Sequence, residues 1–338
     1  MHTLARAPAR RSLPVLVLGG GLLLLAVCVA SLMLGAGEVT PGQALAVLFG
    51  GGNEQARFVL AELRGPRTLM GLVTGMALGC AGALMQTLAR NPLAEPGLLG
   101  ISAGSGFAVT LALLLGASSV TLSVHVAQLG ALAGCLLVLS AARLQGTGND
   151  PVRLVLAGAT LSSLLLALTS LVLLFDQRSA DEIRFWIIGS VAGRDLATLM
   201  QVLPSLLLAL LLMLLLARPL AALALGESVA TGLGHHPGRV RLLTVLVVAL
   251  LTGSATAVAG PVLFVGLVVP FAARALAGPD IRRSLWLSAL LGPVMVIAAD
   301  TVSRLLVAPA ELPLGVLTAL IGAPVLIAVV RGRRLPTL

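Results

Sequence analysis

The length of the apolar runs restricts the fold of this chain more than any other feature. Residues 206–217 read LLLALLLMLLLA, and similar runs recur between residues 13 and 331. Of the 338 residues, 58% are hydrophobic and only 10% are charged. A run of about 20 apolar residues is long enough to cross the hydrocarbon core of a bilayer as a helix. The sequence therefore predicts an all-α polytopic membrane protein.

Windows of apolar residues bounded by charge, proline or glycine predict ten membrane segments. They cover residues 13–35, 66–89, 93–107, part of 108–142, 152–175, 196–217, 240–259, 261–276, 285–308 and 312–331. The third and eighth are short for a full crossing, as broken helices are. The first is too long for a secretory signal, so we expect a retained helix. Because no polar stretch is long enough to form its own core, we expect a single transmembrane domain over residues 1–338.

The arginines predict the orientation of these segments. If both termini are cytoplasmic, fifteen arginines lie on the cytoplasmic side: Arg6, Arg10, Arg11, Arg90, Arg143, Arg153, Arg218, Arg239, Arg241, Arg274, Arg282, Arg283, Arg331, Arg333 and Arg334. The same side holds only three acidic residues, Asp150, Glu227 and Asp280. Such an excess of basic residues is typical of cytoplasmic loops, so we expect the N and C termini to be cytoplasmic.

One stretch interrupts the apolar pattern within the predicted bundle. Residues 86–106 read QTLARNPLAEPGLLGISAGSG, with two prolines, four glycines and two charges. Non-helical backbone at membrane depth must be packed inside protein or line a water-filled cavity. The stretch therefore indicates a transport path, with Arg90, Asn91 and Pro92 as a cytoplasmic turn. Glu95 is either a proton carrier or a structural charge, and the resemblance described below favours the structural charge.

What the sequence lacks excludes several classes of protein. It contains no lysine, so a phosphate-binding G-x-x-x-x-G-K-[ST] loop cannot form. The net charge of +9 comes without a basic stripe and interleaved aromatic residues, which argues against nucleic acid. Cys28, Cys80 and Cys135 lack metal-ligand spacing. We expect no enzyme activity and no metal site, so either an ion gradient or a separate subunit supplies the energy.

Two patterns concern packing. Gly71, Gly75 and Gly79 recur every four residues with Gly82 close by, which predicts close approach of helix backbones. Residues 221–230 lie in a polar connection and predict a short amphipathic helix with Leu223, Leu225 and Val229 on one face. Composition alone leaves open whether this helix lies on lipid or docks into a partner.

Three long blocks carry a resemblance to a known family. The segment from Arg64 to Gly106, RGPRTLMGLVTGMALGCAGALMQTLARNPLAEPGLLGISAGSG, resembles the signature of the FecCD-type permeases of type II ABC importers, which carry iron chelates or cobalamin. Residues 253–284 and 299–331 agree with the same family in the same order. PVRLVLAG at Pro151 and EIRFWIIGS at Glu182 look most like its ferric-enterobactin-type members.

The resemblance implies roles for particular residues. The connection at about residues 219–238 matches a cytoplasmic coupling helix that docks on an ATPase, through Ala221, Leu223, Leu225, Gly226, Glu227, Ala230, Gly232 and Leu233. On the outer face Arg64, Arg67 and Arg304 match arginines that receive glutamates of a binding protein. The alternatives are internal pairs, Arg304 with Asp300 and Arg64 with Glu62.

The family's structural and translocation motif matches Gln86, Asn91, Pro92, Gly100, Gly104, Gly266 and Pro270. One position departs from the family, because Phe271 stands where relatives commonly have histidine.

The implied function is ATP-driven import of a ferric siderophore, of a catecholate type, across the bacterial cytoplasmic membrane. The implied partners are a homologous permease subunit, two ATPase subunits that use ATP and magnesium, and a periplasmic or surface-tethered binding protein. This chain itself needs no cofactor. A haem or cobalamin permease that forms a homodimer is the alternative within the family, and an ion-coupled carrier is the alternative outside it.

Overall fold

The computed structural model describes residues 12–35, 39–117, 124–144, 151–307 and 310–331, and within these ranges the chain forms helices and turns without strands. Seven of the helices are long and apolar enough to cross a membrane, and three shorter apolar helices, α5, α12 and α14, accompany them. The prediction of an all-α membrane protein with about ten spans is confirmed. The ten long elements are α1 (Leu13–Met33), α4 (Gly65–Ala89), α5 (Ile101–Leu114), α6 (Val124–Leu144), α7 (Pro151–Phe175), α9 (Leu196–Ala224), α11 (Pro237–Ala259), α12 (Val265–Ala277), α13 (Ile281–Leu306) and α14 (Leu314–Arg331).

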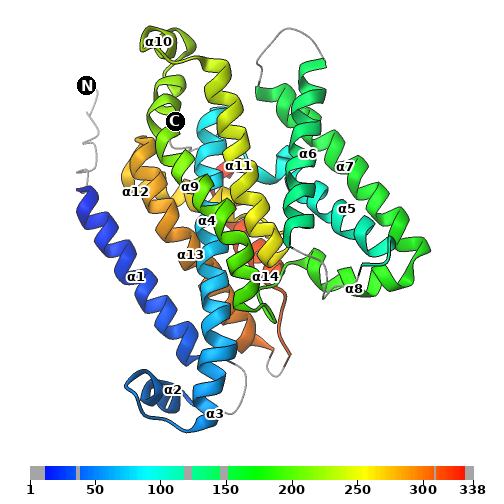
Figure 1. The fold of residues 1–338 in the computed structure, drawn as a ribbon. Helices are drawn as coiled ribbons and strands as arrows, with labels where there is room; N and C mark the ends of the chain where they lie inside the picture. The colour runs from blue at the N-terminus through cyan, green and yellow to red at the C-terminus, as the bar shows by residue number, and fades with distance from the viewer. Residues whose placement is uncertain (1–11, 36–38, 118–123, 145–150, 308–309, 332–338) are drawn as a thin grey trace.

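Short elements join them at the two ends of the bundle (Figure 1). They are α2 (Pro41–Leu48), α3 (Glu54–Phe58), a π-helix (Val59–Arg64), a 3₁₀ helix (Pro96–Leu99), α8 (Gln177–Ile188) and α10 (Glu227–Gly232). Helix α10 lies at one end and helices α2 and α3 lie at the other, and we call these the α10 end and the α2–α3 end.

The predicted third segment has the wrong boundaries. The sequence predicts a short or broken membrane segment over residues 93–107, but α5 begins only at Ile101 and continues to Leu114. Pro92 and Pro96 disfavour a helical residue before them, and Gly100 has a positive φ of 71°. The regular helix therefore starts after Gly100, and the preceding residues form turns and the 3₁₀ helix.

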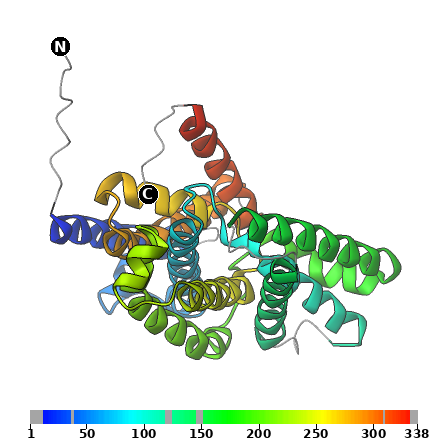
Figure 2. The ribbon, with the colours of Figure 1, turned by 90° about the horizontal axis from the view of Figure 1, so that it is seen from above.

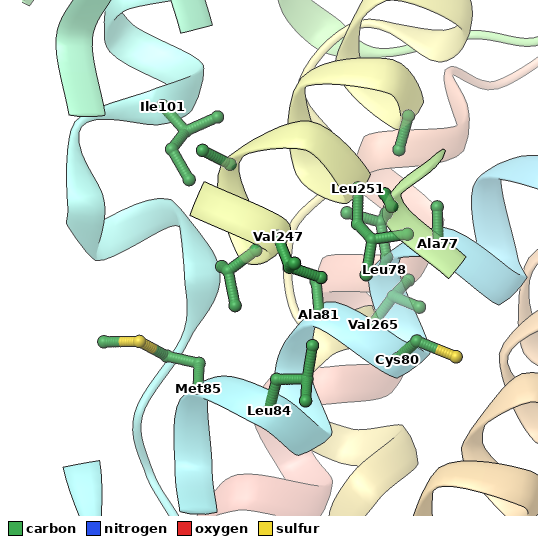
Figure 3. Packing of buried hydrophobic residues seen from close by; sticks show 14 of the residues in the cluster. Ala77, Leu78, Cys80, Ala81, Leu84, Met85, Ile101, Val247, Leu251 and Val265 are labelled. Carbon is green, nitrogen blue, oxygen red and sulfur yellow. The ribbon is translucent and has the colours of Figure 1, made fainter. Parts of the chain in front are cut away.

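Helix α4 lies at the centre of the bundle, surrounded by α9, α11, α12 and α13 (Figure 2). Of the residues in its most apolar stretch, 83% are buried. Small side chains such as Ala77 and Ala81 alternate with Leu78 and Leu84 and pack against Val247 and Leu251 of α11 and Val265 of α12 (Figure 3). The interior is thus built from short side chains that let the neighbouring helices approach closely.

Four of the five glycines of α4 form a glycine seam, composed of Gly71, Gly75, Gly79 and Gly82. A Cβ atom at Gly79 would lie 2.6 Å from the carbonyl oxygen of Ser288 in α13, and one at Gly75 would meet the backbone of Gly292. At Gly82 the obstacle is the backbone of Gly266 in α12. The predicted close packing is confirmed, because no side chain larger than hydrogen fits at these contacts.

Candidate translocation path and its two ends

The interrupted stretch forms a buried turn between α4 and α5. Arg90 ends α4 in the left-handed region with φ 48°, and the amide of Asn91 donates to the carbonyl oxygen of Gln86 at 3.1 Å. Asn91 then accepts a hydrogen bond from the amide of Leu93 at 2.9 Å. Gln86, Ala94 and Leu99 are at most 2% exposed. Arg90 and Asn91 are exposed at the start of the turn, whereas the backbone from Ala94 to Gly100 is mostly packed inside protein, as non-helical backbone at membrane depth has to be.

Gln86 joins this turn to α12. Its Nε2 donates to the carbonyl oxygens of Gly266 and Leu267 at 3.4 and 3.2 Å, and its Oε1 accepts from Nη2 of Arg274. Arg274 is only 4% exposed. The sequence did not mark Arg274 as more than one of fifteen cytoplasmic arginines, because its partner lies 188 residues away. A buried guanidinium needs such a partner, so this contact fixes α12 against α4.

Glu95 contacts the start of α12. Its Oε1 accepts a hydrogen bond at 3.0 Å from the amide of Phe264, the residue that precedes α12 and has φ 67°. A carboxylate at a helix N-terminus is stabilised by the exposed amides and the helix dipole. This geometry agrees with the prediction that Glu95 is a structural charge.

The remaining motif residues lie at close helix contacts. Gly100 and Gly104 face Gly130 and Gly134 of α6, and a Cβ atom at Gly104 would lie 2.9 Å from Cα of Gly134. Pro270 is buried inside α12, and Phe271 next to it is partly exposed. The structure therefore brings Gln86, Gly100, Gly104, Gly266 and Pro270 into helix interfaces around the turn, whereas Asn91 and Pro92 are less buried.

The connection between α9 and α11 differs from the expectation. Instead of one helix over residues 221–230, α9 continues to Ala224 and a separate α10 starts at Glu227. The break falls at Gly226, whose φ of 134° is incompatible with a helix. Leu223 and Ala230 are buried, whereas Leu225 and Leu233 are 76% and 64% exposed. The predicted single apolar stripe is therefore wrong.

The residues predicted to couple to an ATPase thus separate into two groups. Ala221, Leu223 and Ala230 pack toward the bundle, whereas Leu225, Glu227, Gly232 and Leu233 are solvent-accessible at the tip, together with Val229. Gly226 forms the bend between them.

Two arginines fasten this connection to the bundle. Nη2 of Arg90 donates to the carbonyl oxygen of Leu223 at 2.6 Å, in the last turn of α9. Arg241 of α11 forms an ion pair with Glu227 of α10. The carbonyl oxygen of Leu223 also accepts from the amide of Gly226 at 3.1 Å, so Arg90 supplies a second donor to it from the turn between α4 and α5.

At the α2–α3 end, Arg64 and Arg304 are buried at 4% and 2% exposure. Arg64 Nη1 donates to the carbonyl oxygens of Leu32 and Met33 at 3.0 and 3.1 Å. Arg304 Nη1 donates to those of Ser31 and Leu34 at 3.2 and 3.1 Å. Together they satisfy the carbonyl groups at the end of α1.

Arg67 instead lies between two carboxylates. Its Nη2 is 2.7 Å from Oδ1 of Asp300, and its Nη1 is 2.8 Å from Oε2 of Glu311. The predicted alternative pair of Arg304 with Asp300 is present at 3.2 Å. Arg64, by contrast, uses backbone carbonyls and not Glu62, and Glu62 is exposed. The role of the three arginines in docking stays a prediction.

Glu311 was missed by the sequence analysis. Its partner Arg67 is 244 residues distant, and neither helical spacing nor a motif connects the two. Only the antiparallel packing of α4 against α13, and the return of the chain toward α14, brings them together.

A buried, glycine-packed central helix and an interrupted connection among about ten spans define a membrane permease with the fold of ABC importers. The chain is 30% identical to a metal-chelate type ABC transporter solved in an inward-facing conformation, with a TM-score of 0.81 over 94% of this chain and 99% of that one. The model of the FecCD transport family matches residues 10–332, and the chain belongs to this family.

Two curated relatives illustrate the range of the family. The ferric enterobactin transport system permease protein FepD of Escherichia coli strain K12 is 45% identical, over 92% of this chain and 94% of the relative. The Fe(3+) dicitrate transport system permease protein FecC of the same organism is 39% identical, over 81% of this chain and 83% of the relative.

Proposed function

We propose that this chain is the permease subunit of an ATP-driven importer that carries a ferric siderophore of the catecholate type across the bacterial cytoplasmic membrane. The observation that carries the proposal is the 45% identity to FepD along almost the whole chain. The buried turn between α4 and α5 supplies the interrupted backbone that a transport path requires.

The proposed orientation has the α10 end in the cytoplasm, together with both termini. The arginines at the helix ends and turns on this side, such as Arg90, Arg239, Arg282 and Arg283, support it through the positive-inside rule. The exposed Leu225 and Leu233 beside α10 then face an ATPase subunit, which binds ATP and magnesium. This chain contributes an apolar tip and no nucleotide site.

A second, homologous permease subunit completes the proposed pathway. Helix α7 is only 17% buried in its most apolar stretch, and an open apolar groove of about 600 Å³ lies between α8 and α14, lined by Ile187, Ile188, Val316 and Leu320 among others. These exposed apolar surfaces are candidates for the contact with a second subunit. A heterodimer fits the proposed siderophore importer.

The internal contacts suggest how nucleotide-driven movement reaches the path. A displacement of α10 is passed to α9, and Arg90 passes it from the end of α9 to the turn between α4 and α5. Glu95 then connects this turn to the start of α12, and Gln86 connects the end of α4 to the start of α12 and to Arg274 in its last turn. None of these groups needs to recognise the cargo, so selectivity resides in the binding protein.

The test is uptake by proteoliposomes that contain the complete transporter. Labelled ferric catecholate, ferric citrate, ferric hydroxamate, haem and cobalamin are offered with their binding proteins, with and without ATP. We expect ATP-dependent uptake of the ferric catecholate. Preference for haem or cobalamin contradicts the substrate assignment, and uptake that needs an ion gradient but no ATPase subunit contradicts the class of transporter.

A further inference from the structure

Arg64, Arg67 and Arg304 lie at the α2–α3 end, but different groups hold their guanidinium groups in place. The guanidinium groups of Arg64 and Arg304 are held mainly by backbone carbonyls at the end of α1. To release either one, the end of α1 would have to lose its capping contacts. These two arginines are therefore fixed parts of the fold.

Arg67 is held on one side by a fixed carboxylate and on the other by an accessible one. Nε and Nη2 of Arg67 donate hydrogen bonds to Oδ1 of Asp300 at 2.9 and 2.7 Å. The Asp300 side chain is 4% exposed. Nη1 of Arg67 donates to Oε1 and Oε2 of Glu311 at 2.9 and 2.8 Å. The Glu311 side chain is 33% exposed and lies on the connection between α13 and α14.

We propose that Glu311 occupies on Arg67 the position that a carboxylate of the substrate-binding protein takes during docking, so that binding proceeds by exchange of one carboxylate for another. This inference rests on the proposed function, and it narrows the docking role from three arginines to Arg67. The partner it specifies is a protein surface that presents an accessible aspartate or glutamate.

The energetics favour such an exchange. A partly buried guanidinium that lost one carboxylate without replacement would be left with an unsatisfied N–H group, which is costly. Glu311 prevents this cost while no partner is bound. Because the Glu311 side chain is 33% exposed, an external carboxylate with good bidentate geometry can reach this pair and replace Glu311.

The charges around Arg67 support an acidic partner. Arg64, Arg67 and Arg304 carry three positive charges, and Asp300 and Glu311 carry two negative ones. Displacement of Glu311 exposes a further positive charge to the approaching surface, which increases its attraction for a carboxylate.

The exchange also acts on the rest of the chain. Glu311 is three residues before α14, whose first residue Leu314 is 2% exposed, and a Cβ atom at Gly315 would meet the backbone of Ile188 at the end of α8. Displacement of Glu311 therefore pulls on the connection that leads into the wall of the apolar groove. Docking of the binding protein at the α2–α3 end is in this way linked to α14.

The experiment measures the affinity of the purified binding protein for the complete transporter in nanodiscs. Glu311→Gln removes the internal competitor, and we expect binding about two- to fivefold tighter than wild type. The matched control is Glu62→Gln, which removes one negative charge at the same end from an exposed residue that does not contact Arg67. We expect no change in affinity for this control.

Arg67→Glu should weaken binding by at least about 30-fold. Glu311→Ala provides a second test of release if the glutamine variant assembles poorly, and it should also tighten binding. Unchanged or weaker binding in both Glu311 variants, or an equal gain in Glu62→Gln, overturns the exchange. If the wild-type transporter binds no siderophore-binding protein at all, the proposed function itself fails, and this outcome is distinct from a failure of the exchange alone.

Discussion

Helices α4 and α7 are both 25 residues long and strongly apolar, yet they occupy opposite environments. In its most apolar stretch α4 is 83% buried, whereas α7 is 17% buried. The difference lies in side-chain size, because α4 carries the glycine seam, whereas α7 presents leucines such as Leu164 and Leu171, which are 55% and 51% exposed. Apolar character thus places a helix in the membrane, and small residues decide which helix the others surround.

The largest effect is expected from a bulky side chain in the glycine seam. Gly75→Leu places a branched side chain against the backbone of Gly292 and Pro293. Because backbone cannot move aside as a side chain can, we expect a loss of more than about 4 kcal/mol of stability and little assembled protein. Assembled protein is measured by fluorescence-detected size-exclusion chromatography.

The exposed helix α7 supplies the matched control. Ala167→Leu makes the same kind of change on the exposed side of α7 and should leave the single subunit folded. If Gly75→Leu assembles as well as Ala167→Leu, the distinction between the two helices is incorrect. A dimer that dissociates in Ala167→Leu, with folded subunits, would instead identify α7 as part of the subunit contact.

The second largest effect concerns the polar contact between α4 and α12. Gln86→Leu removes the partner of the buried Arg274 and should cost about 3–5 kcal/mol, as expected for a buried charge left without its partner. Gln86→Glu supplies a carboxylate at the same place and should retain more stability than Gln86→Leu. Thermal unfolding of the purified subunit in detergent measures both, and equal loss in the two variants would contradict the role of Arg274.

A smaller effect is expected at Arg90. Arg90→Ala removes the hydrogen bond to the carbonyl oxygen of Leu223, a contact worth about 1.5–3 kcal/mol for a charged donor. We expect more ATP hydrolysed for each substrate transported, with partial rescue in Arg90→Lys. Arg239→Ala, which removes an exposed arginine in the first turn of α11 at the same end, is the control. An unchanged ratio of ATP to substrate in Arg90→Ala would exclude this contact from coupling.

The smallest effect is expected at the start of α9. Hydrogen bonds from the amide and hydroxyl of Thr198 lower the pKa of Asp195. Because the folded-state pKa is depressed, the stabilisation is present above the unfolded-state pKa of about 3.9 and is lost as the pH falls through the folded-state value. In wild type this contribution should vanish in acid, whereas Asp195→Asn should show no such dependence. Melting curves between neutral and acidic pH test this.

Much of the fold follows from local sequence. The spans are recognisable because apolar length is a property of consecutive residues, and the glycine seam because its members recur with helical spacing. The error at residues 221–230 has a local cause, since the helical propensity of the neighbours was given more weight than the break at Gly226. Boundaries around Pro92 and Pro96 were misplaced for a similar reason.

The contacts of the site are less predictable. Arg274 with Gln86 and Arg67 with Glu311 join residues far apart in the chain, and a single sequence carries no signal for such pairs. The left-handed conformations of Arg90 and Phe264 are likewise set by tertiary contacts and not by residue type.

The glycine seam has a mechanical consequence. Because α4 meets backbone atoms of α13 at Gly75 and Gly79 and the side chain of Ile297 at Gly71, the two helices cannot slide past each other without a steric clash. We expect them to behave as one rigid body throughout the transport cycle. We expect the hinges of alternating access to lie elsewhere, at α7, which is 17% buried in its most apolar stretch, or at α8 and α14, which border the groove.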